Sequence, residues 1–249
     1  MDHRILGTTM PVLEMTLGAG ESIVATPGEL SWMSANVQMR TSTQMAGSAG
    51  LFGALKRALG GGGLFMTEYS AQNAAGMVAF AAKIPGQILP VDVTPGKGYM
   101  IHKHGFVCGT SGVELSIGFQ RTLGAGVFGG NGFILQKLAG TASAWIELGG
   151  EIVIYELAPG QTLLVHPGHV GMFDESVKFD ITMIRGIKNI IFGGDGVFLA
   201  QLSGPGKVWL QSLTLPNLAH AIGQYIGGEA AGAGVAGGIA GAVLKGLSG

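Results

Sequence analysis

Charged residues are scarce in this sequence. Aspartate, glutamate, lysine and arginine make up 12% of the 249 residues, and the formal net charge is −1. A chain so close to neutral has no bulk electrostatic attraction for nucleic acid, so we do not expect a nucleic-acid partner. Because 47% of the residues are hydrophobic, few charges remain to solvate the surface. Part of that surface is therefore expected to be covered by other copies of the chain or by a membrane.

Cysteine and aromatic residues are also few. The single cysteine, Cys108, excludes an internal disulfide framework, and its place on the apolar face of an alternating segment predicts a buried thiol. Aromatic residues account for 7% of the chain, which argues against RNA binding by base stacking. Residues 1–4 lack the apolar core of a signal peptide. We expect a cytoplasmic protein, with membrane association as the open alternative.

The common catalytic motifs are missing as well. No Ser/His/Asp series, paired-carboxylate motif or C-x-x-C stands out, so we favour a protein that is not an enzyme and has no cofactor. Glycine runs at 60–63, 129–132 and 193–196 are not followed by the Lys and Ser or Thr of a phosphate-binding loop. We interpret these runs as hairpin turns between strands.

The most prominent positive feature is an internal repeat. An alternating apolar segment followed by a glycine occurs three times, with shifts of 76 and then 64 residues between the copies. The copies lie at 13–17, 89–93 and 153–157, and the glycines are Gly20, Gly96 and Gly160. Apolar residues at every second position have the period of a strand with one buried face.

This repeat predicts an all-β fold. We expect three tandem β-sandwich-like repeats, at about 10–80, 86–148 and 150–213, in a pseudo-threefold arrangement. Units of about 65 residues are marginal alone, so the copies should share a core. Residues 1–217 would form this β domain, and 218–249 would form a short C-terminal helix with a Gly/Ala-rich tail.

Two segments outside the repeat pattern suggest contacts with partners. Residues 51–59 have a basic amphipathic pattern that suits a short helix docked on its own sheet or a membrane surface. Small residues recur every fourth position in the tail, at Ala230, Gly234, Gly238, Ala242 and Gly246. Such a stripe permits close helix packing, so we expect the tail at a homo-oligomer interface in preference to a membrane span.

Three histidines form a candidate metal site. The pattern Gly96-x5-His102-x-His104 resembles the start of the first cupin metal motif, and His166 corresponds to His102 under the repeat. Two histidines separated by one residue on a strand share a face, as metal ligands must. The glutamate of the cupin motif is missing, however, and the alternative is an ordinary polar turn between strands.

Three arginines form a candidate anion site. Arg57, Arg121 and Arg185 are spaced 64 residues apart and would converge if the copies surround one axis. A guanidinium suits carboxylate and phosphate. The alternative is local pairing of each arginine.

The glycine-bearing motifs together resemble the AIM24 family over about residues 5–215. The motifs are Gly20-Glu21, residues 27–30, residues 55–57 before Leu64-Phe65, residues 85–88, residues 192–196 and residues 202–206. This resemblance implies a β fold like that of the tryptophan-sensing RNA-binding attenuation protein, a small sandwich related to double-stranded β-helices. Eukaryotic members are linked to mitochondrial inner-membrane organisation. The resemblance implies no established activity and no catalytic residues.

Three functional hypotheses follow. The first is a non-enzymatic, self-associating structural, scaffold or binding protein that contacts a membrane through residues 51–59 or the tail. The second is a cupin-like metal protein or enzyme that uses His102, His104 and His166. The third is a ring protein that binds a small ligand or RNA.

Overall fold

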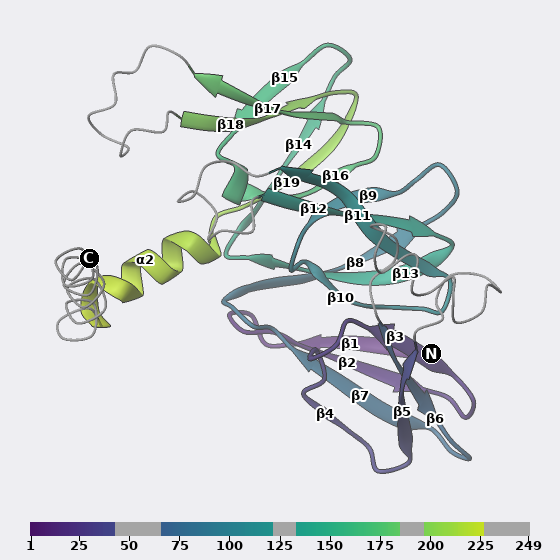
Figure 1. Ribbon diagram of the computed structural model, residues 1–249. Helices are drawn as coiled ribbons and strands as arrows, with labels where there is room; N and C mark the ends of the chain where they lie inside the picture. Colours follow the sequence, from purple (N-terminus) through teal and green to yellow (C-terminus); the bar gives the residue numbers. More distant parts are fainter. Residues whose placement is uncertain (43–65, 122–132, 185–196, 227–249) are drawn as a thin grey trace, which may run out of the picture. The chain divides into compact units, whose positions relative to one another are not determined.

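The structure is a computed structural model that describes residues 1–42, 66–121, 133–184 and 197–226. The chain divides into two compact units, Met1–Leu213 and Thr214–Gly249. In the described residues, the first unit contains four antiparallel sheets, and the second contains helix α2 (Leu215–Ile226) (Figure 1). The prediction of a mostly β protein with a short C-terminal helix is therefore confirmed.

The described strands of the first unit follow β1 (Asp2–Leu6) in three groups, which we call segments I, II and III. Segment I comprises β2 (Val12–Leu17), β3 (Ser22–Ala25), β4 (Trp32–Met33), β5 (Val37–Ser42), β6 (Met66–Ala71) and β7 (Gly76–Ala81). Segment II comprises β8 (Gly86–Val93), β9 (Tyr99–His102), β10 (Phe106–Gly109), β11 (Val113–Arg121), β12 (Phe133–Gly140) and β13 (Ala142–Gly149). Segment III comprises β14 (Ile152–Leu157), β15 (Thr162–Val165), β16 (Val170–Asp174), β17 (Lys178–Ile184), β18 (Val197–Ser203) and β19 (Gly206–Gln211), with a 3-10 turn, η1 (Pro167–His169), before β16.

The alternating pattern produces strands, as predicted, and the first of them has one buried face. In β2, Leu13, Met15 and Leu17 are completely buried, whereas Thr16 between them is exposed. The corresponding stretches of segments II and III are also strands, β8 and β14. Gly20, which follows β2, has a φ of +79° and allows the tight turn into β3.

One pairing scheme occurs in every segment. The first strand pairs with the sixth, and the sixth also pairs with the third. The fifth strand pairs with both the second and the fourth. In segment I these groups are β2-β7-β4 and β3-β6-β5. The pseudo-threefold arrangement of the segments stays a prediction.

Neighbouring segments are joined by strand pairing. Strand β3 of segment I pairs with β10 of segment II, and β9 of segment II pairs with β16 of segment III. Each junction completes a six-stranded sheet, β5-β6-β3-β10-β13-β8 in one case and β11-β12-β9-β16-β19-β14 in the other. The two remaining groups, β1-β2-β7-β4 and β15-β18-β17, form smaller sheets that end at β4 and β15.

The segments also share buried side chains. One apolar cluster contains Val24 from β3, Ile101 from β9 and Met172 from β16, which are at most 1% exposed. Three sequence-distant strands therefore contribute to one core. This agrees with the expectation that the segments do not stand as separate beads.

Helix α2 begins at Leu215 rather than at the expected Leu218. The Thr214 hydroxyl accepts a hydrogen bond from the backbone N–H of Asn217 at 3.2 Å and so caps the helix. Pro216 fits the first turn, where a missing N–H costs little. The expected contact segment 51–59 and the tail 227–249 lie outside the described residues.

Candidate functional site

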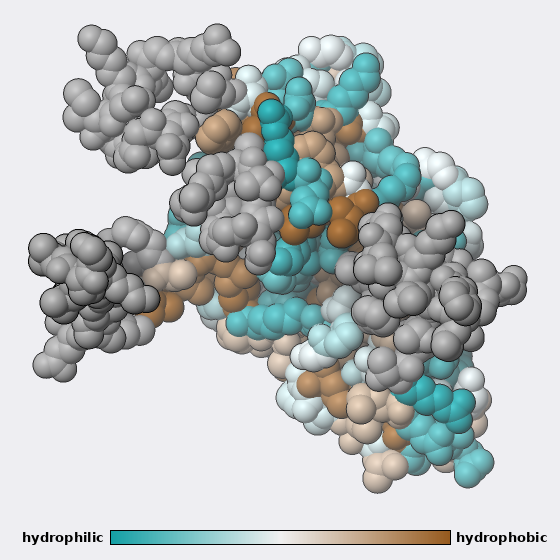
Figure 2. All heavy atoms as spheres, in the orientation of Figure 1, coloured by the Kyte–Doolittle hydropathy of each residue, from teal (hydrophilic) through white to brown (hydrophobic). Residues whose placement is uncertain are grey.

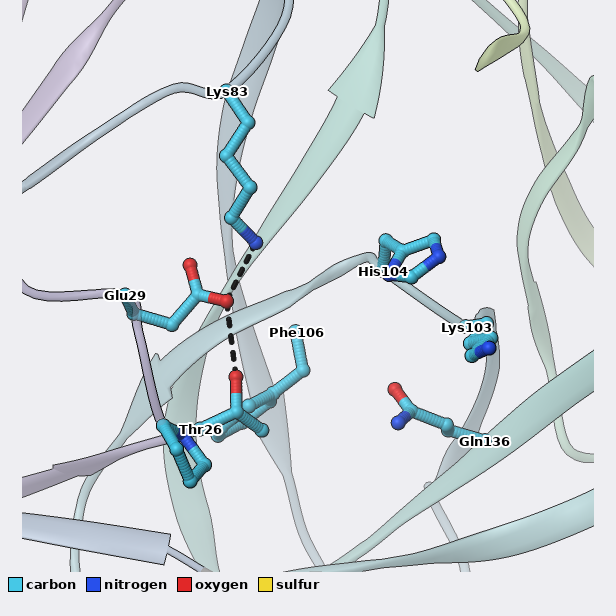
Figure 3. Close-up of a pocket in the computed structure, with 8 residues that line it drawn as sticks. Thr26, Glu29, Lys83, Lys103, His104, Phe106 and Gln136 are labelled. Carbon is cyan, nitrogen blue, oxygen red and sulfur yellow. Dashed lines mark hydrogen bonds and ion pairs between the residues drawn. The ribbon is translucent and has the colours of Figure 1, made fainter. Parts of the chain in front are cut away.

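A pocket of about 340 Å³ lies where segments I and II meet (Figure 3). The turn after β3 contributes Thr26, Pro27 and Glu29, and the link between β7 and β8 contributes Lys83. Strands β10 and β12 and the turn between β9 and β10 supply the other lining residues, which are Lys103, His104, Phe106 and Gln136. The pocket therefore depends on both segments.

Glu29 and Lys83 form an ion pair at one wall of the pocket. Lys83 Nζ lies 2.5 Å from Glu29 Oε1, and the Thr26 hydroxyl donates to the same oxygen at 3.0 Å (Figure 3). The Glu29 side chain is 8% exposed, whereas Lys83 is 43% exposed. A carboxylate so buried needs these two donors, because an unpaired buried charge is strongly unfavourable.

Glu147 at the end of β13 fixes the neighbouring backbone. Its Oε1 accepts hydrogen bonds from the N–H groups of Lys83, at 2.7 Å, and Ile84, at 3.2 Å. Burial raises the pKa of the Glu147 carboxyl, and these two hydrogen bonds oppose that rise. Because both donors belong to the link that carries Lys83, Glu147 holds the Lys83 side chain over Glu29.

His102 is part of this support. Its Nε2 lies 3.0 Å from the Glu147 backbone oxygen. A carbonyl oxygen only accepts, so Nε2 carries the proton and donates. Burial lowers the pKa of His102 to about 4, against an opposing effect of the hydrogen bond. The ring is therefore neutral at pH 7.

The opposite wall of the pocket is polar and partly unsatisfied. Gln136 on β12 is 7% exposed, and its Oε1 is buried without a hydrogen-bond partner. Figure 3 shows its amide directed into the space between Phe106 and His104. Burial lowers the pKa of His104, and the charges of Lys103 and Lys83 lower it further. The pocket thus combines the charge of Lys103 and the Glu29–Lys83 pair with an acceptor that has no partner among the described residues.

The three histidines of the candidate metal site do not form a metal-binding group. His102 uses Nε2 for the Glu147 carbonyl, and His104 lines the pocket. His166 precedes η1 in segment III, where its ring centroid lies 5.8 Å from that of His169. Among the described residues there is no group of three or more His, Cys, Asp or Glu side chains placed to hold a metal ion.

Of the three arginines, only Arg121 lies within the described residues. Its Nη1 donates to the Ile181 carbonyl at 3.3 Å and lies 3.7 Å from Asp180 Oδ1. The Arg121 guanidinium is thus paired locally, which is the alternative to a shared anion site. Arg57 and Arg185 lie outside the described residues, so convergence of the three on one anion stays a prediction.

The pocket depends on residues that sequence analysis did not select. Glu29 belongs to a motif that carried the family resemblance, but that motif gave no role for it. Lys83 is a lone charge in an apolar stretch, which is a usable signal for a paired side chain. Gln136 gave no signal. Cys108 is completely buried, and burial raises the pKa of its thiol, as the predicted role in the core requires.

A second candidate site is an apolar area of segment III, which we call the β14–β15 surface. It consists of Val153, Tyr155 and Leu164, which are between 45% and 50% exposed. In segment I, the positions corresponding to Val153, Tyr155 and Leu164 are Leu13, Met15 and Val24, which are at most 1% exposed. Figure 2 shows apolar residues reaching the surface among hydrophilic ones on the face in view.

In segment I these positions are covered by the following segment. Leu13 and Met15 belong to one buried cluster with Val107 and Cys108 of β10. Strand β10 is the strand that segment II contributes to the junction with β3. No described segment follows segment III, so Val153 and Tyr155 lack the corresponding cover.

Within the described ranges, no helix has the length and apolar character needed to cross a membrane. A search of the curated proteins found no match. Among solved structures, the crystal structure of protein SPYM3_0169 from Streptococcus pyogenes is similar, with a TM-score of 0.70 and 23% sequence identity. The similarity covers 90% of this chain and 99% of that one, and at this identity it establishes the fold alone. The family model described as "Mitochondrial biogenesis AIM24" matches residues 3–213, so this chain belongs to the AIM24 family.

Proposed function

We propose that this protein is a non-enzymatic structural protein that self-associates. The observation that carries the proposal is the exposure of the β14–β15 surface at positions whose counterparts in segment I are buried. Burying a large apolar side chain completely contributes about 1.5–3 kcal/mol, so half-exposed side chains gain part of this in an interface. The low content of charged residues, 12% of the chain, supports the same conclusion.

Multi-angle light scattering of the full-length protein tests this proposal. We expect a mass that is a multiple of the 25.4 kDa chain, and a shift toward 25.4 kDa in a Val153→Lys, Tyr155→Lys variant. A Met10→Lys variant is the matched control, since Met10 is also an apolar side chain, 46% exposed, outside the β14–β15 surface. A wild-type mass of 25.4 kDa at every concentration contradicts the proposal.

Two further expectations from the sequence, the arrangement of the repeats and contact with a membrane, belong to this proposal. The recurring pairing scheme supports three copies of one unit, and a pseudo-threefold arrangement of them would further require β15 to meet β4. Contact with a membrane surface through residues 51–59 or the tail is the alternative to contact between copies. Sedimentation of the full-length protein with anionic lipid vesicles separates the two, because self-association needs no lipid.

A second candidate function is the binding of a small anion in the pocket between segments I and II. The observation that favours it is the buried, unpartnered Oε1 of Gln136 in a pocket that Lys103 also lines, while Lys83 is paired with Glu29 at the other wall. A hydroxycarboxylate suits this arrangement, because its hydroxyl can donate to Gln136 while its carboxylates accept from lysine.

Calorimetry with citrate tests this second function. We expect binding heat with the wild type, and at least a tenfold weaker affinity for Lys103→Met, since a lost hydrogen bond to a charged group costs about 1.5–3 kcal/mol. Arg121→Ala is the control, because Arg121 does not line the pocket. Equal affinities of wild type and Lys103→Met, or no heat at all, exclude the pocket as a citrate site.

A further inference from the structure

The pairing between segments follows one register, and it occurs twice. At the first junction, Cys108 lies opposite Ala25 and Gly109 lies opposite Val24. At the second junction, Met172 lies opposite Ile101 and Phe173 lies opposite Met100. The shifts of 76 and 64 residues convert the first set of pairs into the second. The second strand of one segment therefore joins the third strand of the next in a fixed alignment.

The same rule assigns a partner to the two strands that end the smaller sheets. Strand β4 is the third strand of segment I and pairs only with β7 among the described strands. Strand β15 is the second strand of segment III and pairs only with β18 among them. Each therefore has one edge without a described partner strand. In Figure 1 the two strands lie at opposite ends of Met1–Leu213.

From this we infer that the free edge of β15 in one chain pairs antiparallel with the free edge of β4 in a second copy. In the register of the two junctions, Val165 lies opposite Trp32 of the second copy, and Leu164 lies opposite Met33 of the second copy. The inference rests on the proposed self-association and names its interface. Because the two edges differ, the contact is head-to-tail.

The side chains at these edges fit a covered position better than an exposed one. Trp32 is 46% exposed, whereas the corresponding residues of β10 and β16, Cys108 and Met172, are completely buried. Leu164 is 50% exposed, whereas the corresponding Val24 is 1% exposed. Pairing with β4 of a second copy also places apolar side chains over Val153 and Tyr155, as β10 does over their counterparts in segment I.

Neither edge carries the features by which proteins prevent edge pairing. Charged side chains and prolines on an edge strand block its extension. Residues 31–34 around β4 are Ser-Trp-Met-Ser, and β15 is Thr-Leu-Leu-Val. Both edges are thus free of charge and proline, and both expose apolar side chains. A second copy of this chain supplies an edge with the required register.

Disulfide trapping between two separately prepared chains tests the register. One chain carries Met33→Cys and the other carries Leu164→Cys, and the native Cys108 stays buried in both. The Cα atoms of directly opposite residues lie about 4.5–5.5 Å apart, within reach of a disulfide. We expect a cross-linked dimer on mild oxidation of the mixture. Replacing Leu164→Cys with Thr162→Cys moves the thiol about 6–7 Å along the strand and should abolish most of the cross-link.

Light scattering of a Leu164→Lys variant gives an independent measurement. Leu164 is half exposed, so the lysine is accommodated in the single chain while it blocks the edge. We expect the mass to fall to 25.4 kDa, with Met10→Lys keeping the wild-type mass. The edge pairing is overturned if the Leu164→Lys variant still assembles and the Met33→Cys and Leu164→Cys chains give no cross-link. That result leaves the proposed self-association intact. A wild-type chain that is monomeric at all concentrations overturns both.

Discussion

Glu29 is the residue on which the pocket between segments I and II depends most. Its carboxylate is nearly buried, and its two described donors come from Thr26 in the same turn and from Lys83 in the link between segments. The backbone of that link is held in turn by Glu147, whose carbonyl oxygen accepts from His102. A chain of polar contacts thus connects the turn after β3 to the end of β13.

Removing the cation from this pair should destabilise the fold. In Lys83→Met, the buried Glu29 carboxylate keeps only the Thr26 hydroxyl of its two described donors. Since Lys83 is 43% exposed and water screens the pair, we expect a loss of about 1 kcal/mol in the free energy of unfolding. Urea denaturation measures it. Lys137→Met, which removes the pair with Glu175, in which both side chains are 41% exposed, is the control and should cost less than about 0.5 kcal/mol.

His102 should make the stability fall in mild acid. Its pKa is about 4 in the folded chain and about 6.5 in the unfolded chain, so the unfolded chain binds more protons between these values. The stabilisation that the neutral His102 ring gives to the folded chain is complete above pH 6.5, and it is lost as the pH falls toward 4. Between pH 7 and 5, we expect the free energy of unfolding to fall by about 1–2 kcal/mol more in the wild type than in His102→Asn. This figure is reduced because the ring is partly exposed.

The raised pKa of Glu147 acts in the opposite direction, because the folded chain then holds a proton that the unfolded chain releases. The effect of Glu147 is the same in the wild type and in His102→Asn. The difference between the two proteins in lost unfolding free energy is therefore due to His102. Urea midpoints at the two pH values supply the data. Equal losses in both proteins contradict the assignment of a neutral, buried ring.

At the scale of elements, the period of the apolar residues predicts strands well and says little about their partners. Alternation identifies β2 and β8, which bury apolar residues on one face, and also β14, whose Val153 and Tyr155 are exposed in the single chain. It does not describe β10, where all four residues from Phe106 to Gly109 are buried. That strand lies between β3 and β13, and it contacts the cores of two segments. Burial on both faces follows from pairing between segments, which no local pattern encodes.

The same limit applies to the candidate sites. His102 ends β9 and His104 lies in the turn that follows, but a two-residue spacing does not reveal that His102 donates to a backbone carbonyl 45 positions away. The links from Glu29 to Lys83 and from Lys83 to Glu147 likewise join residues distant in the chain. Such contacts depend on the pairing of strands and become visible only in the fold.

The strands that join segments should be sensitive to truncation of their side chains. Ile101 on β9 is completely buried and lies opposite Met172 of β16 and Gln136 of β12. We expect Ile101→Ala to cost about 2–5 kcal/mol of unfolding free energy, through lost burial and the cavity left behind. Chemical denaturation measures this loss. Ile154→Ala is the comparison, and because Ile154 is 55% exposed its cost should stay below about 1 kcal/mol.

At the scale of the whole molecule, shared sheets and a shared core predict joint unfolding of the segments. Val24, Ile101 and Met172 from three segments lie in one buried cluster. Loss of one segment therefore exposes the core of its neighbour, and we expect a single thermal transition for Met1–Leu213 in the full-length chain. Near-ultraviolet circular dichroism reports this, because Trp32, Trp145 and Trp209 lie in segments I, II and III. Two separated transitions contradict a common core.

The pairing scheme leaves two strands of a single chain with one edge each that no described strand covers. Each junction between segments buries apolar side chains from both, and β4 and β15 are the strands that correspond to the junction strands of the other segments. In our proposal, self-association through these edges extends the internal rule to contacts between molecules.

Hydrogen exchange of β4 and β15 in the full-length protein at high and low protein concentration tests this claim most directly. Amides whose hydrogen bonds form only between copies should exchange slowly in the concentrated sample and at least tenfold faster after dilution to the monomer, while β3 and β10 stay protected in both. Rates in β4 and β15 that do not change while the protein dissociates would contradict it.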